Sequence, residues 1–244
     1  RWSQEDKAPG KVRLCGTRGF GVPFADASLP GGVPKVGYAL RQLGVPGEGL
    51  EWHGHNDLNK VEVNAAAAWL YGCKAANCSI FGMGERTGNP PLEALVIEHA
   101  QLRGTNPKVN YAAITDLANY ANKELGFNLP ANYPLVGKDF NVTRAGIHAD
   151  GLLKNEEIYN CFDTLKLLKR PVGVAITDKS GAAGIKHWIE ERYVIDIPKQ
   201  DPYVLAIKDK IDAEYTADRI SAISDEEMEK WLKELFGDKL PPRR

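Results

Sequence analysis

The stretch LEWHGHNDLNKVEVNAAAAWLYG, residues 50–72, places two histidines one residue apart, after a short apolar run and directly before an alanine-rich segment. Along a β-strand, residues i and i+2 point to the same face, so His53 and His55 would direct two imidazoles toward one point. Asn56 and Asp57 follow them and suit the cap of a helix. The pattern therefore predicts a strand, a histidine pair at its carboxyl end, and then a helix.

This histidine pair has two readings. Two ring nitrogens can converge on one metal ion, and the carboxyl end of a strand is where βα barrels hold their chemistry. The alternative is two strand histidines that hydrogen-bond to backbone carbonyls. Glu51, two residues before His53, also has two readings: an outer acceptor for a ligating imidazole, or an ion-paired glutamate. The residues alone leave both questions open.

Short apolar runs alternate with helical patterns along the first hundred residues. Strands are predicted at residues 1–5, 11–15, 49–53 and 77–83, and helices at 33–43, 58–71 and 91–103. Strand and helix in alternation indicate a parallel sheet built from βα units. Only KAPG (residues 7–10) separates the first two runs, which is too short for a parallel crossover. Those two runs therefore form a hairpin, or residues are absent between them.

The character of the chain changes at about Gly104. Helical stretches such as TDLANYANKELG and SDEEMEKWLKELFG are joined by connections that contain proline and glycine. In the second stretch, Ser224 and Glu227 have the spacing of a capping box. The sequence therefore predicts a βα domain at residues 1–104 and a helical linker with a C-terminal subdomain at residues 105–244.

Composition argues against several classes of partner. The chain has 244 residues, 43% of them hydrophobic, and 31 basic residues stand against 32 acidic ones, so neither nucleic acid nor an anionic membrane would be attracted strongly. No segment approaches the roughly 20 apolar residues that span a bilayer. No signal peptide opens the chain, so a cytoplasmic location is expected. The four cysteines contain no CxxC pair and are expected to be reduced, small buried residues.

Two further segments combine small residues with candidate chemistry. In FGMGERTGNPPLEALVIEHA, Asn89 precedes two prolines and suits a helix N-cap, while the glycines allow a ligand to approach the backbone. This segment lacks the GxGxxG spacing and the lysine of phosphate-binding loops. In DFNVTRAGIHADGLLKNEEIY, His148 follows a small-residue turn and Tyr159 lies on a predicted helix. The sequence leaves open whether His148 has a structural or a catalytic role.

Taken together and in this order, HGHND, GMGERTGN and RAGIHADG resemble the acyl-CoA-condensing branch of the metal-dependent (β/α)8-barrel family, which includes 2-isopropylmalate, homocitrate and Re-citrate synthases. RWSQED, CGTRGFG and DKSGAAG look like the family's fifth-strand, sixth-strand and tail motifs. EWHGHNDLNK, NPPLEALVIEHAQLRG and FNVTRAGIHADGLLKNEEIYN look most like the Re-citrate synthases. The resemblance implies the C-terminal half of a TIM barrel, strands 5–8, followed by a helical subdomain.

The resemblance also implies a metal site. His53 and His55 would be imidazole ligands of a divalent metal, and Asn89 would lie at or next to the coordination shell. Imidazole and oxygen ligands suit Mg²⁺, Mn²⁺, Co²⁺ and Zn²⁺, so the sequence does not choose among them.

By the same resemblance, other residues would handle the substrates. The positions that match binding residues for the 2-oxo acid are Arg1, Ser3 and Thr17, and the acidic residues that match the lining of the site are Glu5 and Glu51. His148 and Tyr159 match a pair that relatives deliver across a dimer interface toward the acetyl group. A homodimer is therefore expected.

The activity that the resemblance implies is a Claisen-type condensation of acetyl-CoA with a 2-oxo acid, with oxaloacetate as the expected substrate and citrate as the product. An acid/base group must take a proton from the acetyl methyl group. His148 with Tyr159 is the candidate for this step, and Glu5 is the rival. The alternatives are a 2-isopropylmalate or homocitrate synthase, a hydroxymethylglutaryl-CoA-type lyase, and a catalytically incomplete fragment or regulatory relative.

Two features depart from the family pattern. Gly16 stands where most members have the aspartate of a sixth-strand DT motif, so one carboxylate hydrogen bond is lost. The first-strand motif that supplies the metal's aspartate and a catalytic arginine has no match. Because the chain also begins without methionine, we expect an upstream portion that holds the first half of the barrel.

Overall fold

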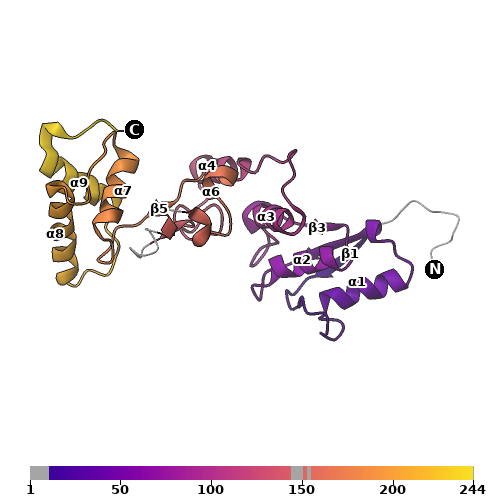
Figure 1. The fold of residues 1–244 in the computed structure, drawn as a ribbon. Helices are drawn as coiled ribbons and strands as arrows, with labels where there is room; N and C mark the ends of the chain where they lie inside the picture. Colours follow the sequence, from indigo (N-terminus) through magenta and orange to yellow (C-terminus); the bar gives the residue numbers. More distant parts are fainter. Residues whose placement is uncertain (1–10, 144–150, 153–154, 244) are drawn as a thin grey trace. The chain divides into compact units, whose positions relative to one another are not determined.

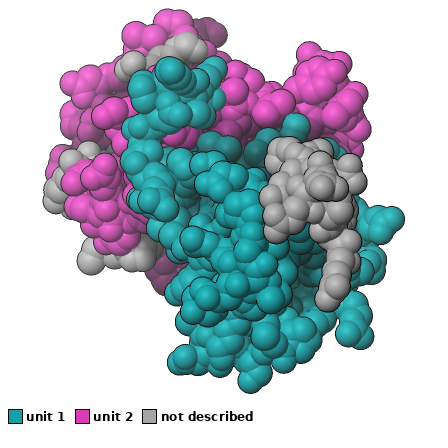
Figure 2. All heavy atoms as spheres, turned by 90° about the vertical axis from the view of Figure 1, so that its right-hand side faces the viewer, with its two compact units in different colours: residues 1–110 teal, residues 111–244 magenta. Residues whose placement is uncertain are grey.

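The structure, a computed structural model, describes residues 11–143, 151–152 and 155–243 (Figure 1). The chain forms two compact units, Arg1–Asn110 and Tyr111–Arg244, which Figure 2 colours teal and magenta. The sequence places its domain boundary slightly earlier, at 104–105, and that boundary stays a prediction. The first predicted strand, residues 1–5, and its connection to the second lie outside the described residues.

Unit 1 is built on a three-stranded parallel sheet in the order β1-β2-β3. Its strands are β1 (Val12–Gly16), β2 (Leu50–Gly54) and β3 (Ala75–Asn77). Its helices are α1 (Val33–Gln42), α2 (Val61–Leu70) and α3 (Leu92–Arg103), with short 3-10 turns η1 (Gly47–Gly49) and η2 (Ile80–Gly82). The strands at 11–15 and 49–53 and the alternation with helices are confirmed.

The two faces of β2 have different neighbours. Leu50 and Trp52 are buried and share one apolar cluster with alanines of α2, because these small side chains let the helix lie close to the sheet. Glu51 and His53 alternate with them and are half-buried. The histidine pair therefore belongs to the face of β2 that does not carry this apolar cluster.

The strand predicted at residues 77–83 is wrong. β3 ends at Asn77, and the apolar residues after it turn through η2, where Phe81 has a φ of 53°. The buried carboxylate of Glu93 accepts the backbone N–H of Phe81 at 2.9 Å. A Cβ on Gly82 would lie 2.9 Å from the carbonyl oxygen of Asn89, and the φ of Gly82 is 67°. An apolar run that reads as a strand is thus bent into a loop around a buried glutamate.

The helix predicted from residue 58 begins later, at Val61. Asn59 has a φ of 55°, which a right-handed helix does not allow. Asn56 still serves the helix start, because its Oδ1 accepts the backbone N–H of Val61 at 3.2 Å. Asp57 does not cap the helix and makes an ion pair described below.

Unit 2 is mostly helical. Its longer helices are α4 (Ala113–Glu124), α7 (Ala182–Arg192), α8 (Pro202–Thr216) and α9 (Asp225–Phe236), and its shorter elements are α6 (Thr164–Leu168), η3 (Glu156–Ile158), η4 (Gly237–Lys239) and the parallel pair β4 (Val142–Thr143) and β5 (Gly173–Val174). Helices α7, α8 and α9 share one apolar core around Trp188, Ile207 and Met228. None of the described helices is long and apolar enough to cross a membrane.

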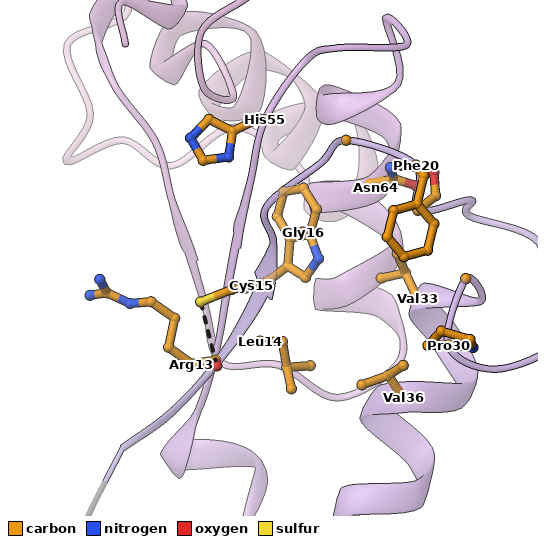
Figure 3. A pocket seen from close by; sticks show the side chains of 14 residues that line it. Arg13, Leu14, Cys15, Gly16, Phe20, Pro30, Val33, Val36, His55 and Asn64 are labelled. Atoms are coloured by element: carbon orange, nitrogen blue, oxygen red, sulfur yellow. Dashed lines mark hydrogen bonds between the residues drawn. The ribbon is translucent and has the colours of Figure 1, made fainter. Parts of the chain in front are cut away.

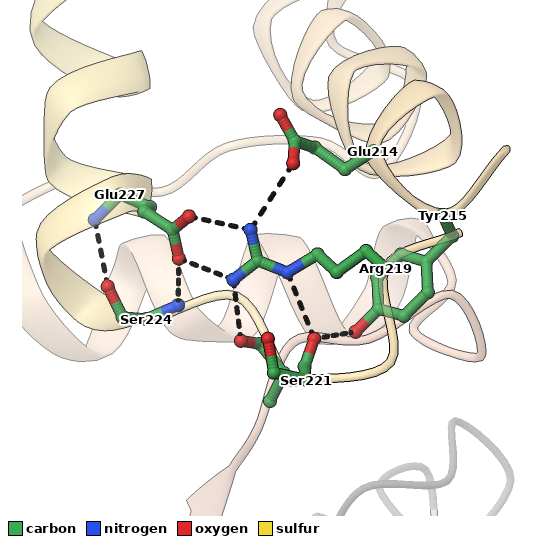
Figure 4. A network of polar contacts seen from close by, with 7 residues as sticks. Glu214, Tyr215, Arg219, Ser221, Ser224 and Glu227 are labelled. Atoms are coloured by element: carbon green, nitrogen blue, oxygen red, sulfur yellow. Dashed lines mark hydrogen bonds and ion pairs between the residues drawn. The ribbon is translucent and has the colours of Figure 1, made fainter. Parts of the chain in front are cut away.

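The start of α9 is fixed by a polar network (Figure 4). The expected capping box is confirmed, since Ser224 Oγ accepts the backbone N–H of Glu227 and Glu227 Oε2 accepts that of Ser224. The guanidinium of Arg219 donates to both carboxylate oxygens of Glu227, at 2.6 and 2.7 Å, and to Glu214 at 3.3 Å. The network joins the end of α8 to the beginning of α9.

The cysteines are only partly as expected. All four are free, but only Cys73 is buried, and burial raises the pKa of its thiol to about 11. Cys15 and Cys161 are exposed, which contradicts the expectation of buried residues. Cys15 pairs in register with His53, so it lies on β1 beside the histidine rather than in the apolar cluster.

Candidate metal site

His53 and His55 lie side by side at the carboxyl end of β2. Their ring centroids are 5.1 Å apart and their planes stand at 88° to each other. Strand alternation explains this placement, since the two residues flank Gly54 and share one face. Two imidazoles are thus brought close enough to share one ion.

Asn77 of β3 holds the first histidine. His53 pairs in register with Asn77, and its Nδ1 lies 2.9 Å from Asn77 Oδ1. Because an amide oxygen only accepts, Nδ1 is the donor in this contact, and Nε2 is the ring nitrogen left for a metal ion. A metal-bound histidine typically donates its second ring nitrogen to such an acceptor. Glu51 does not accept this hydrogen bond. Its carboxylate forms an ion pair with Arg13 at 2.9 Å, which is the second of the two roles expected for it from the sequence.

His55 has an unsatisfied nitrogen. Its Nδ1 is buried and has no hydrogen-bond partner among the described residues. Leaving a buried polar atom unpaired costs about 1–3 kcal/mol. A metal ion that accepted the lone pair would remove this cost, so the orphaned nitrogen fits a cation beside the pair.

The two histidines do not make a complete metal site. Within the described ranges, no group of three or more His, Cys, Asp or Glu residues could hold a metal ion. A divalent ion takes four or more ligands, so further oxygen ligands would join the two imidazoles.

Asn89 contacts the strand between the histidines. Its Nδ2 donates to the carbonyl oxygen of Gly54 at 3.0 Å, which leaves Oδ1 as the amide atom for a ligand. Its Oδ1 lies 2.1 Å from where a Cβ on Gly84 would be, so glycine makes room for the amide. The predicted N-cap role is wrong: α3 has Pro91 at its N-cap and no side-chain cap.

Arg86 ties three strand-end loops together. From the loop after β3, its Nε and Nη2 donate to the two carboxylate oxygens of Asp57 at 2.9 and 3.1 Å, and Nη2 also donates to the carbonyl oxygen of Thr17. The hydrogen bond from Arg86 holds the pKa of Asp57 below its usual range. The loops that follow β1, β2 and β3 are thereby joined beside the histidine pair.

Gly54 has a packing reason to stand between the histidines. A Cβ there would lie 2.1 Å from Cη2 of the Trp52 ring, which is buried. A Cβ on Gly16 would lie 3.5 Å from the same ring. The indole of Trp52 therefore fills the space beside both glycines and sets the path of β2 at the pair.

Sequence reasoning missed Asn77, Arg86 and Trp52 as supports of the site. The GER run inside GMGERTGN was the available signal for Arg86. Asn77 had no signal of its own, because its contact with His53 depends on the register of two strands.

Among the remaining predicted site residues, Thr17 directly follows Gly16, whose carbonyl oxygen accepts the backbone N–H of His55 at 3.3 Å. Arg1, Ser3, Glu5 and His148 lie outside the described residues. Tyr159, expected on a helix, follows the short turn η3 in unit 2 and is 47% exposed. Thr17 is exposed at the end of β1. The roles expected for these residues stay predictions.

Parallel βα units with candidate functional side chains at the carboxyl end of a strand are typical of the βα-barrel class of enzymes. Residues 41–121 match the model of the HMGL-like family. These residues belong to the HMGL-like family, as the motifs indicated, and the fold class of that family is the (β/α)8 barrel.

Curated relatives match along most of the chain. The Citrate (Re)-synthase of Syntrophus aciditrophicus (strain SB) is 51% identical over 93% of this chain and 37% of its own length. That of Clostridium kluyveri is 47% identical over 94% of this chain and 52% of its own length. A 2-phosphinomethylmalate synthase of Streptomyces hygroscopicus is 36% identical over 93% and 52%. The chain spans about half the length of these relatives or less.

Proposed function

We propose that the protein to which this chain belongs condenses acetyl-CoA with oxaloacetate to give citrate, with a divalent metal as cofactor. The identities of 51% and 47% to two Citrate (Re)-synthases support the choice of substrates. The structural observation that carries the proposal is the adjacent pair His53 and His55, with one Nδ1 held by Asn77 and the other buried and unpaired in the described part of the chain.

The bound metal would supply Lewis-acid polarisation of the 2-oxo acid's ketone. His53 and His55 would hold it through ring nitrogens, and Asn89 would offer its Oδ1 next to them. Asn77 would keep the lone pair of His53 on Nε2 by accepting the proton of Nδ1. Which of Mg²⁺, Mn²⁺, Co²⁺ or Zn²⁺ binds is left open by these ligand types.

The reaction also needs groups that handle the substrates. Arg1, Ser3 and Thr17 would bind the carboxylate and carbonyl of the oxo acid. His148 with Tyr159 would take a proton from the acetyl methyl carbon, which then bonds to the ketone carbon while the C=O π bond opens and its oxygen takes up a proton to become the hydroxyl of the product. Water would finally cleave the thioester and release the thiol of coenzyme A.

Acidic residues would line the same site. Glu5 is the rival acid/base group, and Glu51, neutralised by Arg13, would line the site without adding a net charge. A homodimer that brings His148 and Tyr159 of one protomer to its partner's site, and a cytoplasmic location, stay predictions.

A thiol-release assay tests the function. The full-length enzyme is supplied with acetyl-CoA, a divalent metal, and oxaloacetate, 2-oxoglutarate or 2-oxoisovalerate in parallel. We expect the highest kcat/KM with oxaloacetate and citrate as the product. Preference for either other acid would refute the citrate assignment, and efficient cleavage of a hydroxyacyl-CoA without net condensation would identify a lyase.

A further inference from the structure

We propose that unit 1 holds a second small-molecule site, for a neutral apolar ligand that carries one hydrogen-bond donor. The site lies between β1, the loop that follows it, and helices α1 and α2. It goes beyond the proposed function and does not depend on it, because neither the metal nor the substrates of the condensation are needed to fill it.

The site is a cavity of about 320 Å³. This volume falls at the lower end of the range of roughly 300–1,000 Å³ found for small-molecule pockets. Its apolar side chains come from β1, the loop that follows it, α1 and β2, and are Leu14, Phe20, Pro30, Val33, Val36 and Trp52. Figure 3 shows Leu14, Val33 and Val36 gathered on one side of β1. An aromatic or branched aliphatic group matches this lining.

Asn64 of α2 adds one fixed acceptor to the apolar lining. Its side chain is only 2% exposed, and its Nδ2 donates to the carbonyl oxygen of Gly21 at 2.9 Å. That contact fixes which way the amide points, since a carbonyl pairs with the NH₂ group and not with the oxygen. Asn64 Oδ1 is therefore the atom left over, and it is buried with no partner among residues that the structure describes.

Buried acceptors in proteins are normally hydrogen-bonded, so a ligand that donates a hydrogen bond to this oxygen would be favoured. An amide oxygen accepts only, so the ligand must bring an N–H or O–H group to Asn64. The aliphatic and aromatic walls exclude a strongly hydrated molecule, because its other polar groups would be buried without partners. A single donor on an apolar body satisfies both conditions.

The ligand should carry no charge. Arg13 is the charged residue on the cavity wall, and it pairs with Glu51 at 2.9 Å. In Figure 3 its side chain points away from Leu14 and Val36, as strand alternation requires. His55 borders the cavity as well, so the new site would neighbour the candidate metal site while using a different polar atom.

Two probes of the same shape test this site. Indole offers one N–H on an apolar ring system, and indene has the same ring shape without the donor. Binding to the full-length protein, free of metal and substrates, is measured by saturation-transfer NMR. We expect indole to bind about five- to tenfold more tightly than indene, the contribution of one hydrogen bond. In Asn64→Leu the two probes should bind equally.

A second variant keeps Asn64 and its bond to Gly21 intact. Val36→Trp places a larger side chain in the cavity from α1 and should abolish binding of both probes. The control is Tyr38→Ala on the same helix, because Tyr38 is 63% exposed and does not line the cavity. This control should bind indole as the unmodified protein does.

Three results would overturn the proposal: no binding of either probe, equal binding of both to the unmodified protein, or unchanged indole binding in Val36→Trp. The first would leave the cavity to water alone. None of these results would contradict the proposed function, which is tested separately by thiol release and metal binding.

Discussion

His53 Nδ1 lies 2.9 Å from Asn77 Oδ1, so a residue of β3 fixes the proton position of a histidine on β2. This contact connects the sheet register to the chemistry of the site. Any change that shifts β3 relative to β2 would alter which nitrogen of His53 is available to a metal ion.

The first prediction concerns this contact. Asn77→Ala should weaken metal binding by about 10- to 100-fold, because the ligating ring loses the acceptor that orients it. Asn77→Asp keeps an acceptor at that place and should restore most of the affinity. Calorimetric titration with Mn²⁺ or Zn²⁺ measures both variants. An alanine variant with unchanged affinity would show that the amide does not orient the ligand.

The second prediction concerns the fork of Arg86. Arg86→Lys cannot donate to both oxygens of Asp57 and to the carbonyl of Thr17 in the same planar arrangement. We expect faster hydrogen exchange in the loops after β1, β2 and β3. Arg103→Lys, an exposed arginine at the end of α3, is the matched control. Equal exchange in the two variants would contradict the proposed link among the loops.

The same ion pair has a pH dependence with a defined sign. Arg86 lowers the pKa of Asp57 in the folded state, so the pair stabilises unit 1 above the ordinary aspartate pKa of 3.8. That contribution is lost as the pH falls below this value toward the lowered pKa. Arg86→Lys should lose less stability over this interval than the unmodified protein does.

The third prediction concerns the glycine between the histidines. Gly54→Ala should destabilise the protein by about 1–3 kcal/mol, because the new Cβ overlaps the ring of Trp52. Gly181→Ala is the control, since nothing lies within 4 Å of a Cβ there. Urea denaturation compares the two variants. Similar losses in both would mean that Trp52 moves aside at little cost.

The fourth prediction uses the network in unit 2. Arg219 lowers the pKa of Glu227 to about 2, against an ordinary value of 4.5. The carboxylate therefore stabilises unit 2 above pH 4.5, and this contribution disappears as the pH falls from 4.5 toward 2. Glu227→Gln should flatten the decline of Tm over that interval. Glu226→Gln changes an exposed neighbour and should leave the decline as it is.

Local signals in the sequence were enough to predict β1, β2, α1 and α3, because short apolar runs mark the strands, and the prolines before α3 and Gly104 after it mark the ends of that helix. It failed after Asn77, where Glu93 binds the backbone of Phe81 from twelve residues further along the chain. A local sequence pattern does not reveal a contact between residues that lie twelve positions apart. Apolar character alone therefore suggested a strand where the chain turns.

The residues of the candidate site likewise fall into those that the sequence could predict and those that it could not. His53 and His55 could be placed from alternation along one strand, since their relation is local. Asn77 and Arg86 could not, because their contacts join different strands and loops. The N-cap expected of Asn89 failed because α3 begins at Leu92 and has Pro91, two residues after Asn89, at its N-cap position.

The most direct test of the account is metal binding to the full-length protein with one histidine of the pair removed. His53→Ala and His55→Ala should each reduce the affinity for Mn²⁺ or Zn²⁺ by about 100-fold or more while circular dichroism stays unchanged, because each ring would supply one ligand. The control is His99→Ala, because His99 is an exposed histidine of α3 that lies beside Trp69 of α2. This variant should bind metal normally. Metal affinity in both site variants equal to that of the unmodified protein would contradict the central claim that this pair holds the ion.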